Sequence, residues 1–461
     1  MGKPDGHSTT KASERDVFKV ASVAATATSI EYYDFFIYGT ASALVFPALF
    51  FPEQSPVTAL LLSFAAFGIG FIARPLGGMI FGHFGDVVGR KKTLVAALVM
   101  MGVASTVVGL MPTYSSIGLA APILLVALRF IQGIALGGQG GIILLAVEAA
   151  PAPRRGFFGS FSSLGAPGGV LLANLAFLTI TALLPNDALL AWAWRVPFLL
   201  SLGLVALAIY IHFKLEETPA FQRLQQSGTD AVTTKQAKPS VVRSPLVTVL
   251  RTYPKEIALT IGTYLGINLT YYIFITFVIS YGTNPQYLDM PRSTLLAAVL
   301  IGSMGQIIGL PLAGALSDRF GRRRVQLYGA AALAVFVFPF WAMVDTRSFW
   351  LITLGLLIGL GFLHSLLYGV QPTFFAEIFS TEVRFSGVSL GIQIGSVLGG
   401  AFAPLVATAL LARYGSISIA LYMSAACLLT LLSLWLLKET HPSTRQAPSP
   451  AAEVRPSVLE S

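Results

Sequence analysis

Twelve long stretches of mostly apolar residues run through this 461-residue chain, and they restrict what it can fold into. A helix needs about 20 apolar residues to cross the hydrocarbon core of a bilayer. The stretches lie near residues 19–47, 57–82, 93–111, 117–148, 157–184, 193–214, 256–282, 293–316, 325–344, 349–376, 384–411 and 417–437. They lack the alternation of barrel strands, so each predicts a membrane-spanning α-helix.

The composition supports an all-α integral membrane protein. Only 11% of the residues are charged, 55% are hydrophobic and the mean hydropathy is +0.74. A soluble domain carries roughly a quarter charged residues, so this chain has too few to cover a surface that faces water. A single cysteine, Cys427, excludes an internal disulfide and a cysteine-rich metal site.

The net charge of +9 indicates how the chain is oriented in a membrane and does not indicate nucleic-acid binding. Of the 30 Lys and Arg residues, 24 fall in the tails and alternate loops of the predicted topology. Four fall on the other side: Arg195, Arg292, Arg347 and Arg413. This asymmetry predicts that both termini are cytoplasmic. The first apolar run, which contains Glu31 and Asp34, is too long for a cleavable signal peptide.

The chain divides into two halves that repeat one another. We expect an N-terminal tail (1–18), a six-helix half (19–215), a cytoplasmic linker (216–254), a second six-helix half (255–438) and a C-terminal tail (439–461). Asp86 and Asp318 occupy the same place in two similar loops, 232 positions apart. Glu148 and Glu377, 229 positions apart, are each followed by an arginine seven residues on. Two motifs with nearly one offset indicate a duplicated six-helix unit.

Several segments carry a family resemblance that covers nearly the whole chain. The two loops have the pattern G-x-x-x-D-x-x-G-R-[KR], which resembles the signature loop of the major facilitator superfamily. SIEYYDFFIYGTA, RPLGGMIFGHFGD, RFIQGIALGGQGG and LLAVEAAPAPRRGFFGSF resemble the metabolite:proton symporter family within it, which includes shikimate, α-ketoglutarate, citrate and proline/betaine carriers. The resemblance implies a twelve-helix fold in two pseudo-symmetric halves, alternating access, proton-coupled symport of a small organic acid, and a bacterial inner membrane.

The signature loops predict a cytoplasmic gate. Asp86 and Asp318 lie at helix ends, where a carboxylate can meet the positive N-terminus of a neighbouring helix. Arg90 and Arg322 can pair with glutamates at the ends of spans four and ten, which would hold the cytoplasmic side in one state. The alternative is that the basic runs only anchor the topology. The gate residues are Gly82, Asp86, Gly89, Arg90, Glu148, Arg155, Gly314, Asp318, Arg319, Gly321, Arg322, Glu377 and Arg384.

Charged residues inside the apolar stretches mark a site for proton coupling. Glu31 and Asp34 share one face of span one with Tyr38, and Arg129 lies inside span four. Burying such groups is costly, so they need a partner and usually a function. By resemblance, Asp34 takes the proton and thereby releases Arg129. The alternative is a structural ion pair. Relatives usually have Gly-Gly-Glu where this chain has Gly137, Gly138 and Gln139, which leaves an uncoupled facilitator open.

Arg74 in span two is the best candidate to hold a carboxylate, because a guanidinium binds it in a bidentate fork. The alternative is an arginine that anchors its helix. Other candidate substrate contacts are polar residues of the predicted bundle interior: Tyr38, Gln132, Gln139, Asn268, Tyr271, Tyr272, His364, Tyr368, Gln371 and Gln393. For His364 alone, a hydrogen-bonded interior histidine is the favoured interpretation.

The sequence lacks the motifs of an ATPase, a zinc hydrolase or a serine hydrolase. We therefore expect a transporter rather than an enzyme, with no metal or cofactor beyond the coupling proton. Its expected partners are a small organic acid and the lipid bilayer, and we expect a monomer. A membrane sensor that binds but does not transport is the alternative from another class.

Overall fold

The computed structural model describes residues 14–88, 90–137, 147, 150–216, 245–380 and 383–441. Helices dominate these residues, and their positions follow the apolar stretches of the sequence. The helices of the first half are α1 (Glu14–Leu44), α2 (Phe46–Phe50), α3 (Pro56–Val88), α4 (Arg90–Leu110), α5 (Tyr114–Ile117), α6 (Ala120–Gly137), η1 (Ala152–Arg154), α8 (Arg155–Ser160), η2 (Phe161–Ser163), α9 (Gly165–Leu183), α10 (Asn186–Ala188), η3 (Leu189–Ala193) and α11 (Arg195–Glu216).

A short helix, α13 (Pro245–Thr252), precedes the second half. The helices that follow are α14 (Pro254–Tyr272), η4 (Ile273–Phe277), α15 (Val278–Thr283), α16 (Arg292–Phe320), α17 (Arg322–Asp345), α18 (Phe349–Leu356), η5 (Leu357–His364), α19 (Ser365–Tyr368), α20 (Gln371–Ile378), α21 (Arg384–Ser396), η6 (Val397–Ala401), α22 (Ala403–Tyr414) and α23 (Ser416–Leu436).

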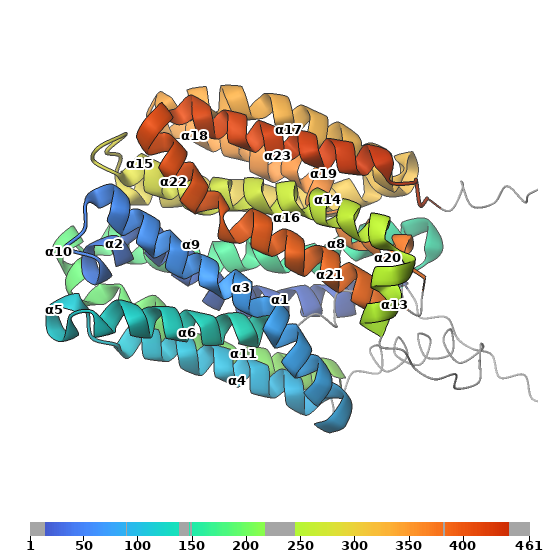
Figure 1. Cartoon of the computed structure of the whole chain (residues 1–461), viewed down its shortest axis with the longest axis horizontal. Helices are drawn as coiled ribbons and strands as arrows, with labels where there is room; N and C mark the ends of the chain where they lie inside the picture. Colours follow the sequence, from blue (N-terminus) through green and yellow to red (C-terminus); the bar gives the residue numbers. More distant parts are fainter. Residues whose placement is uncertain are drawn as a thin grey trace, which may run out of the picture.

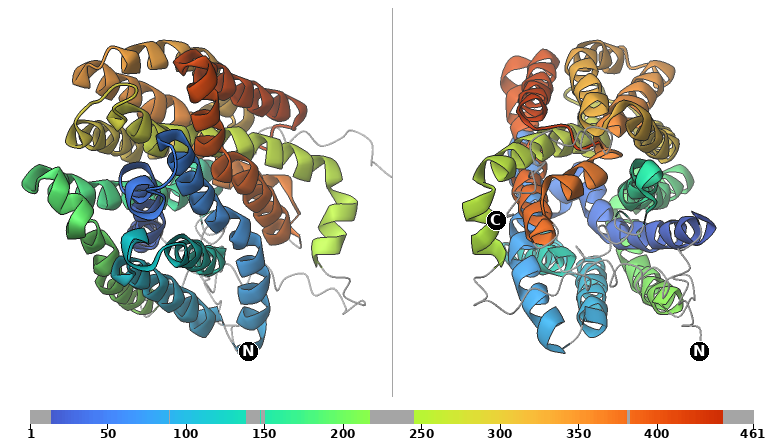
Figure 2. Two further views of the ribbon diagram at one scale, coloured as in Figure 1. Left: turned by 60° about the vertical axis from the view of Figure 1, so that its left-hand side comes forward. Right: turned by 90° about the vertical axis from the view of Figure 1, so that its right-hand side faces the viewer.

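The two halves lie side by side along one axis, with α1 to α11 on one side and α14 to α23 on the other (Figures 1 and 2). We call the end with α13 and α20 the linker end, and the end with α2, α5 and α10 the opposite end (Figure 1). Chain direction places the α3–α4 and α16–α17 connections at the linker end. The architecture is the twelve-helix bundle in two halves that the sequence predicts.

Ten helical stretches within the described residues are long and apolar enough to cross a membrane. Span three contributes a shorter apolar helix over Val95–Leu110. Helix α1 has 31 residues but is less apolar, because its middle carries Glu31, Tyr32, Tyr33 and Asp34. Both carboxylates are at most 2% exposed. The chain therefore places its most polar span in the interior of the bundle, away from lipid.

Three helices of the second half contain π-helical turns near the middle of the bundle. These turns are η4, η5 and η6, which interrupt spans seven, ten and eleven. A π-helical turn leaves local backbone groups less regularly bonded and is frequent at functional sites. Spans seven and ten also supply residues to the central cavity described below.

Helices α3 and α6 pack by interleaved glycines. A Cβ atom built on Gly133 would overlap the carbonyl oxygen of Gly70, and one on Gly77 would overlap that of Ile134. Without side chains at these positions, the two backbones approach closely, as small residues permit between membrane helices. This contact fixes the position of Arg74 on α3 relative to Arg129 on α6.

We expect Gly133→Ala to destabilise the protein by about 1–3 kcal/mol, because α3 and α6 must separate to admit the methyl group. Thermal unfolding in detergent measures the effect. Gly203→Ala on α11 is the matched control, since a Cβ there meets nothing within 4 Å. Equal melting temperatures for the two variants would contradict this account of the packing.

Candidate functional site

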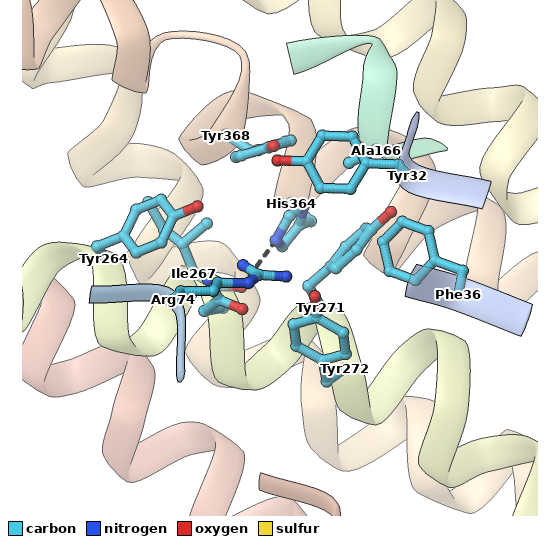
Figure 3. Close-up of a pocket in the computed structure, with 11 residues that line it drawn as sticks. Tyr32, Phe36, Arg74, Ala166, Tyr264, Ile267, Tyr271, Tyr272, His364 and Tyr368 are labelled. Carbon is cyan, nitrogen blue, oxygen red and sulfur yellow. Dashed lines mark hydrogen bonds between the residues drawn. The ribbon is translucent and has the colours of Figure 1, made fainter. Parts of the chain in front are cut away.

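A cavity lies between the two halves, in the interior of the bundle (Figure 3). The empty space, open solvent included, is about 340 Å³. The residues that line it are Tyr32, Phe36, Arg74, Ala166, Tyr264, Ile267, Asn268, Tyr271, Tyr272, His364 and Tyr368. They come from α1, α3, α9, α14, η5 and α19, so a ligand here would contact both halves at once.

Arg74 presents an unused hydrogen-bonding edge to this cavity. The residue is only 8% exposed, and its Nε and Nη2 atoms have no hydrogen-bond partner. These two groups lie on the same edge of the guanidinium plane, which is the edge that binds a carboxylate side-on. The guanidinium carbon lies 4.2 Å from the ring centroid of Phe35 and 4.6 Å from that of Phe71. Aromatic faces hold the cation, while no described anion neutralises it.

His364 is fully buried and both ring nitrogens are engaged. Nε2 lies 3.0 Å from the carbonyl oxygen of Ile267 and Nδ1 lies 2.9 Å from Nε2 of Gln306. A carbonyl only accepts, so Nε2 carries a proton, and Nδ1 accepts from the Gln306 amide in the neutral ring. The ring stacks on Tyr271 with centroids 5.3 Å apart. His364 thus shapes the wall of the cavity as a hydrogen-bonded interior histidine.

Arg129 is completely buried in a cluster of aromatic rings. Its guanidinium carbon lies 4.1 Å from the ring centroid of Phe35, 4.3 Å from that of Tyr38 and 4.9 Å from that of Phe67. The ring of Phe35 therefore contacts both buried arginines. Nη1 of Arg129 donates to Oε1 of Gln132 at 3.3 Å, whereas Nη2 has no partner.

Asp34 is 1% exposed, and neither of its carboxylate oxygens has a hydrogen-bond partner. It forms no ion pair with Arg129; the two described residues are joined only through intervening polar groups. Nε2 of Gln132 donates to the hydroxyl of Ser105 at 2.8 Å, and the Ser105 and Ser201 hydroxyls are close neighbours of Asp34. A polar path thus runs from Arg129 through Gln132 and Ser105 towards Asp34.

The other predicted substrate contacts divide into two groups. Asn268, Tyr271, Tyr272, His364 and Tyr368 line the cavity. Tyr38 and Gln132 instead contact Arg129. Gln371 and Gln393 both lie outside the lining. Gln371 is buried with an unpartnered Nε2, and Gln393 is half-buried. Gln139 lies outside the described residues, and Glu31 is buried on α1 beside Tyr32.

Sequence reasoning missed several residues that line the cavity or contact those that do. Tyr264 lies four residues before Asn268 and seven before Tyr271, so it continues the same helical stripe by one turn. Phe36 lies one turn after Tyr32 on α1 in the same way. Gln306, a buried amide inside the apolar span α16, was also a visible signal. Phe35 carried none, because a phenylalanine in an apolar span is ordinary.

At the linker end, Asp318 joins the two halves. Its Oδ1 and Oδ2 atoms accept the backbone N–H groups of Gly156 and Phe157, each at 2.8 Å. These N–H groups belong to the first turn of α8, where the helix dipole is positive. Gly156 and Gly314 allow α8 and α16 to approach closely, because a Cβ on Gly314 would overlap the carbonyl of Gly156. We call this contact the linker-end latch.

Arg322 lies behind the latch and is completely buried. Its Nη1 is 2.6 Å from Oδ1 of Asp318, and its Nε is 3.6 Å from Oε2 of Glu377. Gly321 precedes it with φ of 101°, a backbone conformation that favours glycine. Asp318 is thus held by a cation on one side and a helix N-terminus on the other.

Residues just after the last span also pack against the latch. Oε1 of Glu439 accepts the backbone N–H groups of Arg322 and Arg323 at the start of α17. The hydroxyl of Thr440 donates to Glu377 at 2.7 Å, and Nε2 of His441 donates to the carbonyl of Asp318 at 2.9 Å. These residues belong to the predicted C-terminal tail (439–461), and in the structure they pack on the second half.

The remaining gate residues lie around this contact or outside the description. The carbonyl of Arg155 accepts the hydroxyl of Thr373 at 3.1 Å, which adds a second link between the halves. Arg319 is exposed beside Phe320, and Arg384 begins α21. Gly89 and Glu148 lie outside the described residues. The side chains of Asp86 and Arg90, and the surroundings of Gly82, are also outside the description, so the first signature loop stays a prediction.

Comparisons with known proteins agree with this architecture. The sequence model of the Major Facilitator Superfamily matches residues 35–390 and 265–460. The chain is 39% identical over 435 residues to the inner membrane metabolite transport protein YhjE of Escherichia coli (strain K12), covering 94% of this chain and 96% of that protein. It is 38% identical over 416 residues to the shikimate transporter of the same strain, covering 89% and 92%.

A solved structure of the xylose transporter XylE from E. coli, in a partially occluded inward open conformation, has a similar fold. The TM-score is 0.70 with 17% sequence identity, over 93% of this chain and 99% of that one. At this identity the likeness concerns the fold alone, and it matches the two six-helix halves described above.

We expect Asp318→Asn to open the linker end, because the amide cannot accept two N–H groups or pair with Arg322. Losing a charged cap is worth about 1–2 kcal/mol, roughly a 5- to 30-fold change in population. Spin labels on cysteines introduced at the exposed positions Lys92 and Arg324, one in each half, measure the distance.

Asp345→Asn is the matched control for this experiment. Asp345 also accepts from two donors, Tyr281 and Ser416, but all three lie in the second half. We expect its distance distribution to match that of the parent protein. A wild-type distribution in Asp318→Asn, or the same change in both variants, would show that the latch does not hold the halves together.

Proposed function

Because this chain belongs to the major facilitator superfamily, we propose that it carries a small organic acid together with protons across a bacterial inner membrane by alternating access. The protein is a membrane transporter of metabolites and not an enzyme. The acid, the proton and the orientation, with both termini and the linker end in the cytoplasm, are the parts that we propose.

One observation carries the proposal: the Phe35 ring contacts the two buried guanidinium groups of Arg74 and Arg129 at 4.2 and 4.1 Å. The guanidinium carbons are therefore roughly 8 Å apart or less, at which distance like charges repel by about 2 kcal/mol at an effective dielectric constant of 20. Arg74 faces the cavity and Arg129 faces the polar path to Asp34. Each site can therefore influence the other through charge.

The coupling follows from the charges that each state must bury. A buried carboxylate with no hydrogen bond and no paired cation is costly when ionised, so this conformation favours protonated Asp34. Protonated Asp34 then does not offset the repulsion between the two arginines. A substrate carboxylate on the free edge of Arg74 removes that repulsion, so proton and anion stabilise the same conformation together.

Alternating access uses the latch as its two-state element. With Asp318 on the first turn of α8, the linker end is held closed on that side of the bundle. Opening this end requires that the carboxylate leave both N–H groups. A loaded, electrically balanced site lowers the cost of moving the halves past one another, since no uncompensated charge remains between them.

The relatives support the substrate class without fixing it. One is named for metabolite transport and another for shikimate, which is a carboxylic acid. A facilitator without proton coupling is the second candidate, favoured by Gln139 where related symporters usually have a glutamate. The two differ in whether a pH gradient drives accumulation.

We expect Asp34→Asn to abolish uptake against a gradient in proteoliposomes with an alkaline interior, while downhill exchange of the labelled acid survives. The neutral amide keeps the shape of protonated Asp34 but cannot release a proton. Glu31→Gln is the matched control, because it is an equally buried carboxylate one turn earlier. Accumulation that survives in Asp34→Asn and fails in Glu31→Gln would move the proton site to Glu31.

We expect Phe35→Leu to lower the accumulation ratio at a fixed pH gradient more than it lowers downhill exchange. The leucine removes the ring that both guanidinium groups contact but keeps an apolar side chain. Phe177→Leu, a fully buried change on α9, controls for lost aromatic volume. If both variants lose exchange and accumulation in the same proportion, Phe35 acts only through packing.

A further inference from the structure

The lining of the cavity offers one cation and no anion. Among the described residues that line it, Arg74 is the single charged side chain. His364 does not add a charge, because its Nε2 donates to the Ile267 carbonyl and its Nδ1 accepts from Gln306 in the neutral ring. The free Nε–Nη2 edge of Arg74 accommodates one carboxylate.

Arg129 cannot serve as a second anchor for the ligand in this conformation. It is 0% exposed, it packs against Phe35, Tyr38 and Phe67, and it is not among the residues that line the cavity. A dicarboxylate would therefore bury its second charge without a partner, which is strongly unfavourable. A zwitterion would depend on aromatic faces alone to hold its cation near Arg74, because the described lining has no carboxylate.

Aromatic rings make up most of the cavity lining. Seven of the eleven lining residues carry a ring. Tyr271 lies at 28° to the ring of His364 and at 31° to that of Tyr368, whereas Tyr272 meets Tyr271 edge-on at 82°. Figure 3 shows Arg74 reaching into the same space that the rings of Tyr264, Tyr271 and Tyr272 surround. Offset stacking favours a planar ligand over a puckered one.

The buried hydroxyl of Tyr271 in this wall lacks a partner. The Tyr271 phenol is 5% exposed, and its oxygen makes no hydrogen bond. A buried unpaired hydroxyl is unfavourable unless a ligand supplies the partner. A polar substituent on the ring of the ligand, away from the carboxylate, would supply it.

Resting on the proposed function, we infer that the transported acid is a planar ring monocarboxylate with a hydrogen-bonding ring substituent. The carboxylate binds the free edge of Arg74, the ring packs against Tyr271 and Tyr368 with Tyr272 at its edge, and the substituent bonds the hydroxyl of Tyr271. This assigns the substrate class from the charge of the lining, its aromatic rings and one buried unpaired hydroxyl.

Equilibrium binding to the purified full-length protein tests the inference without requiring transport. The probes are 4-hydroxybenzoate, benzoate, cyclohexanecarboxylate, shikimate, 2-oxoglutarate and glycine betaine. We expect 4-hydroxybenzoate to bind at least about tenfold more tightly than cyclohexanecarboxylate, which has one carboxylate on a puckered ring, and than 2-oxoglutarate or betaine. Tighter binding of shikimate, 2-oxoglutarate or betaine, or no binding of any probe, overturns it.

Tyr271→Phe tests the substituent. We expect affinity for 4-hydroxybenzoate to fall about three- to tenfold and affinity for benzoate to stay unchanged, because only the former uses the hydroxyl. Tyr328→Phe, at a 74% exposed position on α17, is the control. Equal losses for both ligands would mean that Tyr271 acts through packing, which overturns its assigned contact.

The outcome separates this inference from the proposed function. A dicarboxylate that binds and accumulates with protons would overturn the planar monocarboxylate and leave proton-coupled acid transport standing. If 4-hydroxybenzoate binds tightly but never accumulates under a pH gradient, the planar monocarboxylate stands and proton-coupled transport is overturned.

Discussion

The burial of two arginines that form no ion pair among the described residues governs the rest of the site. Arg74 and Arg129 contact one phenylalanine ring, and each keeps at least one guanidinium nitrogen without a hydrogen-bond partner. Aromatic faces stabilise such cations only in part. The close packing of α3 on α6 holds the two groups near each other, so the energy of this conformation depends on what neutralises them. A substrate carboxylate and the protonation of Asp34 both change that balance.

The linker-end latch connects the charge balance of the central site to the movement of the two halves. Asp318 bridges the halves with two N–H···O bonds and pairs with Arg322, which Glu377 and Glu439 contact in turn. The contacts of Arg322 lie within the second half and can stay intact when the halves separate. The two bonds from α8 to Asp318 must break when this side of the linker end opens. The π-helical turns in spans seven, ten and eleven lie between the latch and the opposite end. The charges of the central site and the hydrogen bonds of the linker-end latch therefore act on the same equilibrium between the closed and the open linker end.

The fold follows from the sequence because span length and apolarity are set by the bilayer and need no knowledge of contacts. Site residues were predictable where the chemistry is unusual for its place: Arg74 is a charge inside an apolar span, and Asn268 and Tyr271 form a polar stripe. Phe35 was not predictable, since its importance comes from two cations on other helices. The position of Glu439 was not predictable either, because a polar residue after the last span ordinarily faces water. The first signature loop keeps only its sequence-based prediction.

The most direct test of this account is the movement of protons driven by the substrate. Proteoliposomes containing a pH-sensitive dye start with equal pH on both sides and a clamped membrane potential, and then receive an inward gradient of the transported acid. The account predicts that the interior acidifies as the acid enters, and that Asp34→Asn takes up the acid without acidification. Uptake by the wild-type protein with no accompanying proton movement would contradict proton coupling through Asp34 and identify the protein as a facilitator.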